Sequence, residues 1–422
     1  MPDGSATAHL FRPKILTVKA EGYGLSAFRS DVLAGLTVAI VALPLSMAIA
    51  VASGVTPERG LYAAIVGGFL VSALGGSRFQ IGGPAGAFIV LVSATVAAHG
   101  LDGLLITVLM SGLALTLIGL TGLGALIRHI PQPVTVGFTC GIAVTILASQ
   151  LRDLGGLTLA GAEPGHLWPK LVALAKALPT LNPSALVIGL GAAALIFAIQ
   201  RLRPMWPGML IAVVLASIAA VLLNLPVETI GSRFGGVPSS LPLPSLPEIT
   251  PARLIELLPA ALSFTLLGGI ESLLSAKIAD GMTGRKHRYN MELVAQGISN
   301  VASAFFGGLC VTGTIARTAT NIRAGARSPV SGMLHAVFLL VFMMVAAPLA
   351  HYIPLAALAG LLLVVCWNMA DKEEFVELLH HWRPTLVLLT TFVVTLAVDL
   401  AVGITAGCVV AAVLHFAGRR GV

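Results

Sequence analysis

The sequence has few charged residues. Asp, Glu, Lys and Arg make up only 10% of its 422 residues, whereas soluble proteins carry roughly 25%. This density is too low to cover a water-facing surface of that size, and it excludes an ordinary soluble protein. Hydrophobic residues make up 57% of the chain, with a mean hydropathy of +0.95. A membrane span needs ~20 apolar residues, so the length fits about fourteen spans and their connections.

Cysteine is scarce as well. Each of the four cysteines lies in an apolar or Gly/Ala-rich stretch without a CxxC pair: Cys140, Cys310, Cys366 and Cys408. We expect buried small residues rather than disulfides or ligands, and no metal or other cofactor. The formal charge of +7 would suggest nucleic acid in a soluble protein. Positive charge in a membrane protein gathers in cytoplasmic loops instead, so we expect no nucleic-acid partner.

Apolar blocks follow one another along the whole chain. They cover residues 31–52, 59–75, 80–98, 102–122, 133–150, 184–201, 207–224, 252–278, 289–308, 312–323, 328–350, 354–369, 384–399 and 400–418. A polar, proline-rich connection at 225–251 separates two halves of seven blocks. We therefore predict an N-terminal segment (1–30), a first half (31–224), a second half (252–418) and a short C-terminal end (419–422). Residues 166–179 predict an interfacial amphipathic helix with Lys170 and Lys176 on its polar face.

The basic residues are distributed unevenly between the two sides of the membrane. An even number of spans places both termini on one side, and that side receives nineteen of the 25 Lys and Arg residues. The positive-inside rule then places both termini in the cytoplasm. We expect a multi-pass protein of the inner (plasma) membrane whose surroundings are the lipid bilayer.

Two blocks are too rich in glycine to be simple spans. Residues 80–87 open the third block of the first half, and residues 307–317 open the third block of the second half. Transporters contain such interrupted helices at matching positions of two repeats. Two facing helix N-termini would present free N–H groups to an anion. The alternative is that glycine here only permits close helix packing.

Two ionisable residues stand out within the blocks. Glu271 lies well inside the eighth block, and Arg317 lies within one turn of the helix start in the tenth. Ionisable residues in spans are rare and usually functional, so Glu271 is a candidate proton or cation site and Arg317 a candidate anion site. A Glu271–Arg317 ion pair would satisfy both. The alternatives are a structural carboxylate and an arginine that reaches the cytoplasmic surface.

Several motifs resemble those of the SulP sulfate permease family, solute carrier family 26. They are residues 42–50 (ALPLSMAIA), 60–62 (GLY), 77–84 (SRFQIGGP), 292–300 (ELVAQGISN) and 312–321 (TGTIARTATN). The resemblance spans roughly residues 30–418. It implies an all-α fold of about fourteen segments in two inverted seven-segment repeats, with short broken helices in segments 3 and 10. It also implies a core domain (segments 1–4 and 8–11), a gate domain (5–7 and 12–14), a homodimer, and anion transport by an elevator-like movement.

The resemblance also implies an anion site on segments 1, 3, 8 and 10. Carried over residue by residue, its substrate-binding positions are Ser46, Ile49, Gly83, Pro84, Ala85, Ser275, Gly313, Thr314, Ile315, Ala316 and Arg317. The coupling acid of segment 8 falls on Glu271.

The sequence departs from the family pattern at three points. Leu45 stands where many members have glutamine, which weakens any assignment to sulfate. Ile315 stands where sodium-coupled bicarbonate members have threonine, so we expect a proton rather than sodium at Glu271. Members usually continue into a cytoplasmic STAS domain, and we expect none here because the sequence ends at Val422.

We therefore predict a proton-coupled transporter of small inorganic or organic anions of the sulfate, bicarbonate or dicarboxylate class. One alternative is an uncoupled anion channel or exchanger. Another is a nucleobase transporter of the same fold, which should have a second carboxylate in segment 10, where this sequence has Arg317. An intramembrane enzyme is disfavoured because Ser331 and His335 are too isolated to form a catalytic set.

Overall fold

The structure is a computed structural model that describes residues 11–122, 131–161, 163–164, 167–204, 206–245, 247–398 and 400–419. Parts of the predicted terminal segments, residues 1–10 and 420–422, lie outside this range. The elements of the first half are α2 (Lys14–Ala20), α3 (Leu25–Ala52), α4 (Pro57–Tyr62), η2 (Ala63–Gly67), α5 (Gly68–Leu74), β1 (Gly82–Gly83), η3 (Gly86–Phe88), α6 (Ile89–Leu120), α8 (Gln132–Gly155), α9 (Leu167–Ala177), η4 (Leu178–Thr180), α10 (Pro183–Leu202) and α11 (Gly208–Leu222). Those after residue 225 are α12 (Ile230–Phe234), α13 (Pro251–Thr283), α14 (Tyr289–Phe305), β2 (Thr312–Gly313), α15 (Ile315–Arg323), α16 (Val330–Ala350), α17 (Leu355–Met369), α18 (Lys372–Leu378), α19 (Trp382–Ala397) and α20 (Leu400–Arg419).

Each of the fourteen predicted blocks contains helix. Among the described residues, seven helices are long and apolar enough to cross a membrane, and three shorter apolar helices accompany them. The remaining three blocks hold the element interrupted by η2, the continuous helix α14, and the short helix α15 that follows β2. The third and fourth blocks form one continuous element, because α6 runs across a kink at Gly100, where φ is 69°. The first block begins earlier than predicted, at Leu25.

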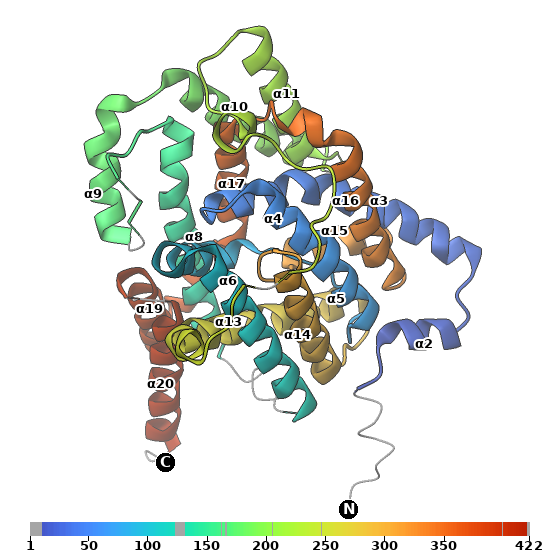
Figure 1. Cartoon of the computed structure of the whole chain (residues 1–422). Coiled ribbons are helices and arrows are strands. Elements are labelled where there is room, and N and C mark those ends of the chain that lie inside the picture. The colour runs from blue at the N-terminus through green and yellow to red at the C-terminus, as the bar shows by residue number, and fades with distance from the viewer. Residues whose placement is uncertain are drawn as a thin grey trace, which may run out of the picture.

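The helices form two groups, which lie side by side in Figure 1. In one group, α6 packs on α13 and α14, while α16 packs on α3 and α5. In the other, α19 packs on α8 and α20, while α17 packs on α8 and α10. Contacts between the groups come mainly from α3 against α11 and α17. These groups correspond to the segments expected for a core and a gate.

Helices α6 and α14 pack extensively and cross at two facing glycines. A β-carbon on Gly297 would lie 2.1 Å from Oγ1 of Thr116 and 2.5 Å from the Gly112 carbonyl oxygen. A β-carbon on Gly112 would in turn lie 2.7 Å from the Gly297 carbonyl oxygen. Only glycine permits the two backbones to approach this closely. Close backbone contact of this kind stabilises helix pairs in membranes, where the hydrophobic effect does not drive helices together.

A buried carboxylate joins the first helix to the eleventh segment. Asp31 in α3 is fully buried and accepts hydrogen bonds from the Arg327 N–H (2.7 Å), the Ser328 N–H (3.1 Å) and the Tyr23 hydroxyl (2.7 Å). The Ser328 hydroxyl donates to it as well. This carboxylate therefore satisfies backbone groups just before α16 that would otherwise be unpaired.

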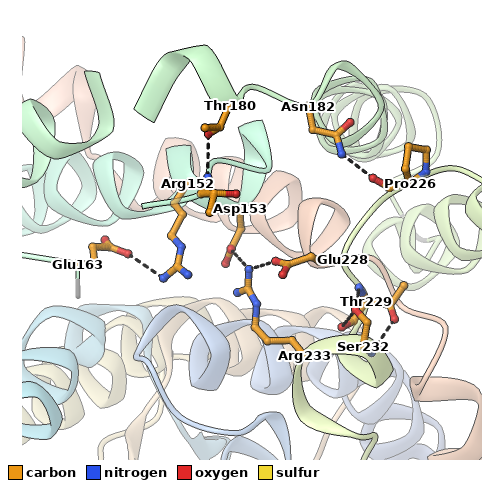
Figure 2. A network of polar contacts seen from close by, with 11 residues as sticks. Arg152, Asp153, Glu163, Thr180, Asn182, Pro226, Glu228, Thr229, Ser232 and Arg233 are labelled. Carbon is orange, nitrogen blue, oxygen red and sulfur yellow. Dashed lines mark hydrogen bonds and ion pairs between the residues drawn. The ribbon is translucent and has the colours of Figure 1, made fainter. Parts of the chain in front are cut away.

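The connection between the halves contains a short helix, α12, that the sequence did not predict. Figure 2 shows Arg233 of α12 between the carboxylates of Asp153 (2.9 Å) and Glu228. Burial disfavours the charge on Arg233, but the two carboxylates offset this and raise its pKa. Asn182, the N-cap of α10, also donates to the Pro226 carbonyl group at 2.5 Å. The connection is thus anchored to α8 and α10, on the gate side.

Helix α9 corresponds to the predicted amphipathic helix at 166–179 and spans Leu167–Ala177. The prediction that Lys170 lies on a solvated face is wrong. Its side chain is buried and pairs with Glu163 at 3.0 Å. Sequence periodicity placed Lys170 opposite the apolar stripe, but the segment after α8 folds back and covers it with a carboxylate.

Candidate functional site

The two interrupted segments meet in the first helix group. Strands β1 and β2 pair antiparallel, with Gly82 opposite Gly313 and Gly83 opposite Thr312. The backbone N–H and the hydroxyl group of Thr314 both donate to the Ile81 carbonyl oxygen, at 2.9 and 3.0 Å. The structure therefore brings together two segments that lie more than 200 residues apart in the sequence.

Side chains pack directly on the backbone of one glycine in each strand. A β-carbon on Gly313 would lie 1.6 Å from Nε2 of Gln80, and one on Gly83 would lie 2.2 Å from Nη1 of Arg317. No side chain larger than hydrogen fits at either position without displacing its neighbour. The glycine-rich composition of residues 80–87 and 307–317 therefore has a local steric cause.

A helix begins directly after each strand. Gly86–Phe88 and then α6 follow β1, while α15 follows β2 with Thr314 as its N-cap. Neither start has a side-chain cap. At α15, the hydroxyl group of the N-cap residue Thr314 donates to the Ile81 carbonyl oxygen instead. Uncapped N–H groups and the positive end of the helix dipole favour an anion at both starts. Ala316 is exposed and Ile315 partly exposed, so the start of α15 borders accessible space.

Arg317 is buried behind these helix starts. Its side chain is 1% exposed, and Nη2 donates to the Pro84 carbonyl oxygen at 3.0 Å. Nε and Nη1 make no hydrogen bond, and within the described ranges no carboxylate lies within 4.0 Å of the guanidinium. A buried cation without a counter-ion is energetically costly, which makes Arg317 the clearest candidate for contact with an anion.

Glu271 lies in α13, which packs against β2. Its Oε2 atom is buried and makes no hydrogen bond to any described residue. The neighbouring polar side chain is Thr312 of β2. The predicted Glu271–Arg317 ion pair is wrong, because Glu271 faces β2 whereas Arg317 lies against Gly83 and Pro84 of the β1 segment.

The other predicted site residues come from elements that surround the strand pair. Helix α15 contacts both α3 and α13, and α13 contacts β2. Ser46 and Ile49 of α3 are buried, and the Ser46 hydroxyl makes no hydrogen bond within the described part of the chain. Ser275 is fully buried, and its hydroxyl donates to Oγ1 of Thr318 at 3.4 Å. Ala85 is buried at the turn into η3.

Sequence reasoning missed several polar residues that shape this site. Oγ1 of Thr318 accepts from the Ile81 N–H at 3.1 Å, and Nδ2 of Asn321 donates to the Phe79 carbonyl oxygen at 2.9 Å. Asn300 bonds both the N–H and the carbonyl group of Val311, at 2.8 and 2.7 Å. These three side chains hold the segments that enter β1 and β2. Thr318 and Asn321 follow Thr314 at helical spacing, a signal that could have identified them.

Two cavities lie away from the strand pair. One of about 670 Å³ lies between α12 and the end of α16 and includes Glu58 and His351. The other, of about 340 Å³, adjoins the network in Figure 2 and is lined by Arg152, Asp153 and Asn182 among others. No three His, Cys, Asp or Glu side chains of the described residues come together to hold a metal.

Comparison with known proteins identifies the family of the chain. The sequence model of the sulfate permease family matches residues 28–395. The chain belongs to this family. The "Putative sulfate transporter YvdB" of Bacillus subtilis (strain 168) is 42% identical over 394 residues, which cover 93% of this chain and 74% of that protein.

Two solved structures share the fold of this chain. "The transmembrane domain of a cyanobacterium bicarbonate transporter BicA" matches with a TM-score of 0.80 and 30% identity, covering 92% of this chain and 98% of that one. The inward-facing structure of murine Solute Carrier 26 family member A9 matches with a TM-score of 0.87 at 18% identity, covering 99% of this chain and 72% of that one. The predicted all-α fold of fourteen segments in inverted repeats is confirmed. The chain is a multi-pass membrane protein of a transporter family, and not an enzyme.

Proposed function

We propose that this protein is a secondary active transporter of small anions of the sulfate, bicarbonate or dicarboxylate class. The observation that carries the proposal is the buried Arg317 guanidinium, which has no carboxylate partner among the described residues. Two uncapped helix starts converge on the same strand pair. An anion bound there would meet a positive charge and free N–H groups together. The names of the relatives, which include sulfate and bicarbonate transporters, support this class.

We assign proton coupling to Glu271. Its carboxyl group lies beside Thr312 of β2, and its Oε2 atom is buried without a hydrogen bond to any described residue. An ionised carboxylate is costly in such a place, so protonation and anion binding stabilise the same state of the site. Substrate positions are those predicted above, together with Thr318 and Gln80. Because α15 carries no carboxylate to bond a base, an anion is favoured over a nucleobase.

Movement of the core group against the gate group would expose the site alternately to the two sides. The strand pair belongs entirely to the core group, and α3 provides most contacts to the gate. We assign residues 31–224 and 252–418 to the two inverted repeats, 225–251 to the outer connection, and both termini to the cytoplasm. We propose a homodimer in the plasma membrane.

Uptake into proteoliposomes tests the proposal. Radiolabelled sulfate, bicarbonate and fumarate are offered with and without an inward proton gradient. We expect uptake of at least one anion above empty liposomes, stimulated by the gradient. Absence of any anion uptake contradicts the proposed function. Uptake that ignores the gradient contradicts the coupling and favours an uncoupled channel or exchanger.

A further inference from the structure

His335 of α16 is a buried histidine to which the function proposed above gives no role. Its side chain is fully buried, and neither ring nitrogen has a hydrogen bond in the part of the chain that the structure describes. The carbonyl group of Gly332, one turn earlier, lies near the ring without hydrogen-bond geometry. A neutral imidazole carries one donor and one acceptor. Leaving each unsatisfied in a protein interior costs about 1–3 kcal/mol, so a buried orphan imidazole calls for a partner.

The ring lies beside strand β1. The β-carbon position of Gly68 is 3.9 Å from Cε1 of His335 and 2.8 Å from the Gly82 carbonyl oxygen. One turn earlier, the β-carbon position of Gly332 is 3.2 Å from Cδ1 of Ile81, the residue that precedes β1. Helix α16 therefore passes along β1 at both Gly332 and His335.

The other orphan groups beside this strand belong to Arg317. Its Nη1 lies against Gly83, the residue that follows Gly82, and neither Nη1 nor Nε has a hydrogen-bond partner among the described residues. His335 and Arg317 thus lie near two consecutive residues of β1, Gly82 and Gly83. A guanidinium can only donate, whereas a neutral imidazole offers an acceptor. The unsatisfied groups on the two side chains are therefore complementary.

We propose that His335 is a positioning residue for Arg317 and acts through one buried water molecule. The water accepts a hydrogen bond from an unpaired guanidinium N–H and donates one to an imidazole nitrogen. Buried waters that join otherwise unsatisfied groups in this way are regular parts of protein interiors. The bridge holds the guanidinium in the orientation in which Nη2 bonds the Pro84 carbonyl group at the start of η3. The inference rests on the proposed function, since it assigns His335 to the same anion site.

The test is the concentration dependence of anion uptake by His335 variants in proteoliposomes, using whichever anion of the panel the wild type transports fastest. His335→Met removes the ring nitrogens at similar length, and we expect KM to rise about tenfold, the effect of one hydrogen bond to a charged group. We expect Vmax to change less than twofold. His335→Gln keeps an acceptor at similar reach and should restore KM to within about threefold of the wild-type value. Met343→Leu, a buried change further along α16, should leave KM unchanged.

A double-mutant cycle separates positioning from general packing. In an Arg317→Ala background, His335→Met should change KM less than twofold, because its effect passes through the guanidinium. If His335→Met does not purify as a monodisperse protein, His335→Asn, whose amide is too short to hold the bridge, should give the same tenfold increase. The inference is overturned if His335→Met or His335→Asn has the wild-type KM. It is also overturned if His335→Gln raises KM as much as His335→Met does, or if His335→Met raises KM just as much in the Arg317→Ala background. Wild-type protein that transports no anion overturns the proposed function instead.

Discussion

A β-carbon on Gly83 would lie 2.2 Å from Nη1 of Arg317. The guanidinium group of Arg317 therefore occupies the space that the methyl group of an alanine at position 83 would need. The other terminal nitrogen of Arg317, Nη2, donates to the Pro84 carbonyl oxygen at 3.0 Å, so both ends of the guanidinium fork lie against the β1 segment. The geometry of the positive charge thus depends on the absence of a side chain at one position of β1.

The first prediction follows from this contact. Gly83→Ala should displace Arg317 and raise the KM for anion uptake at least tenfold, or abolish uptake, while the protein still folds. Gly191→Ala is the matched control, because nothing lies within 4 Å of its β-carbon position in α10. Proteoliposome uptake and thermal unfolding in detergent check both variants. Wild-type uptake by Gly83→Ala would mean that the position of Arg317 is immaterial.

The second prediction concerns coupling. Glu271→Gln cannot release or bind the coupled proton, so uptake should continue without stimulation by an inward proton gradient. For one coupled proton, a gradient of one pH unit corresponds to about 1.4 kcal/mol, or about tenfold accumulation, in the wild type. Glu256→Gln on the same helix, whose carboxylate is exposed and pairs with His99, should keep the wild-type response. If an inward proton gradient still stimulates anion uptake by Glu271→Gln, Glu271 is not the coupling site.

The third prediction concerns the buried carboxylate of α3. Asp31→Asn leaves an amide N–H group facing the hydroxyl groups of Tyr23 and Ser328. The loss of charge-assisted bonds should lower the free energy of unfolding by about 1.5–3 kcal/mol. Thermal unfolding in detergent measures this, with the exposed Asp102→Asn as control. Equal stability of the two variants would show that Asp31 does not hold α3 to the start of α16.

The fourth prediction concerns the crossing of α6 and α14. Gly297→Ala would place a methyl group 2.5 Å from the Gly112 carbonyl oxygen, and backbone cannot move away without parting the helices. We expect a loss of about 1–3 kcal/mol of stability, whereas Gly281→Ala, with nothing within 4 Å, should be neutral or stabilising. An unaltered unfolding temperature for Gly297→Ala would contradict the close crossing.

Much of this architecture is readable in the sequence. The apolar blocks predict the helices, and the two glycine-rich segments predict the interrupted elements that meet as β1 and β2. Local composition is sufficient for these features, because a span must be apolar and a broken helix must contain glycine. The position of Arg317 within one turn of a helix start also follows from the sequence, whereas its burial does not, because an arginine there could equally reach the cytoplasmic surface.

The partners of the buried polar groups do not follow from the sequence. Asp31 bonds a residue 297 positions away, and Glu292 accepts from the Ser77 N–H 215 positions away. Such pairings depend on how the two repeats interlock. For the same reason the sequence suggested a Glu271–Arg317 pair and treated His335 as isolated. The rotation of α13 and α16 about their own axes determines which groups Glu271 and His335 face, and hydropathy does not encode this rotation.

The central claim is that Arg317 supplies the positive charge to which the transported anion binds. The most direct test is the KM for uptake by Arg317→Ala, measured in proteoliposomes with the anion that the wild type transports fastest. A hydrogen bond to a buried charge contributes about 1.5–3 kcal/mol, so KM should rise at least tenfold. An Arg317→Ala protein that folds and transports with the wild-type KM would contradict the account.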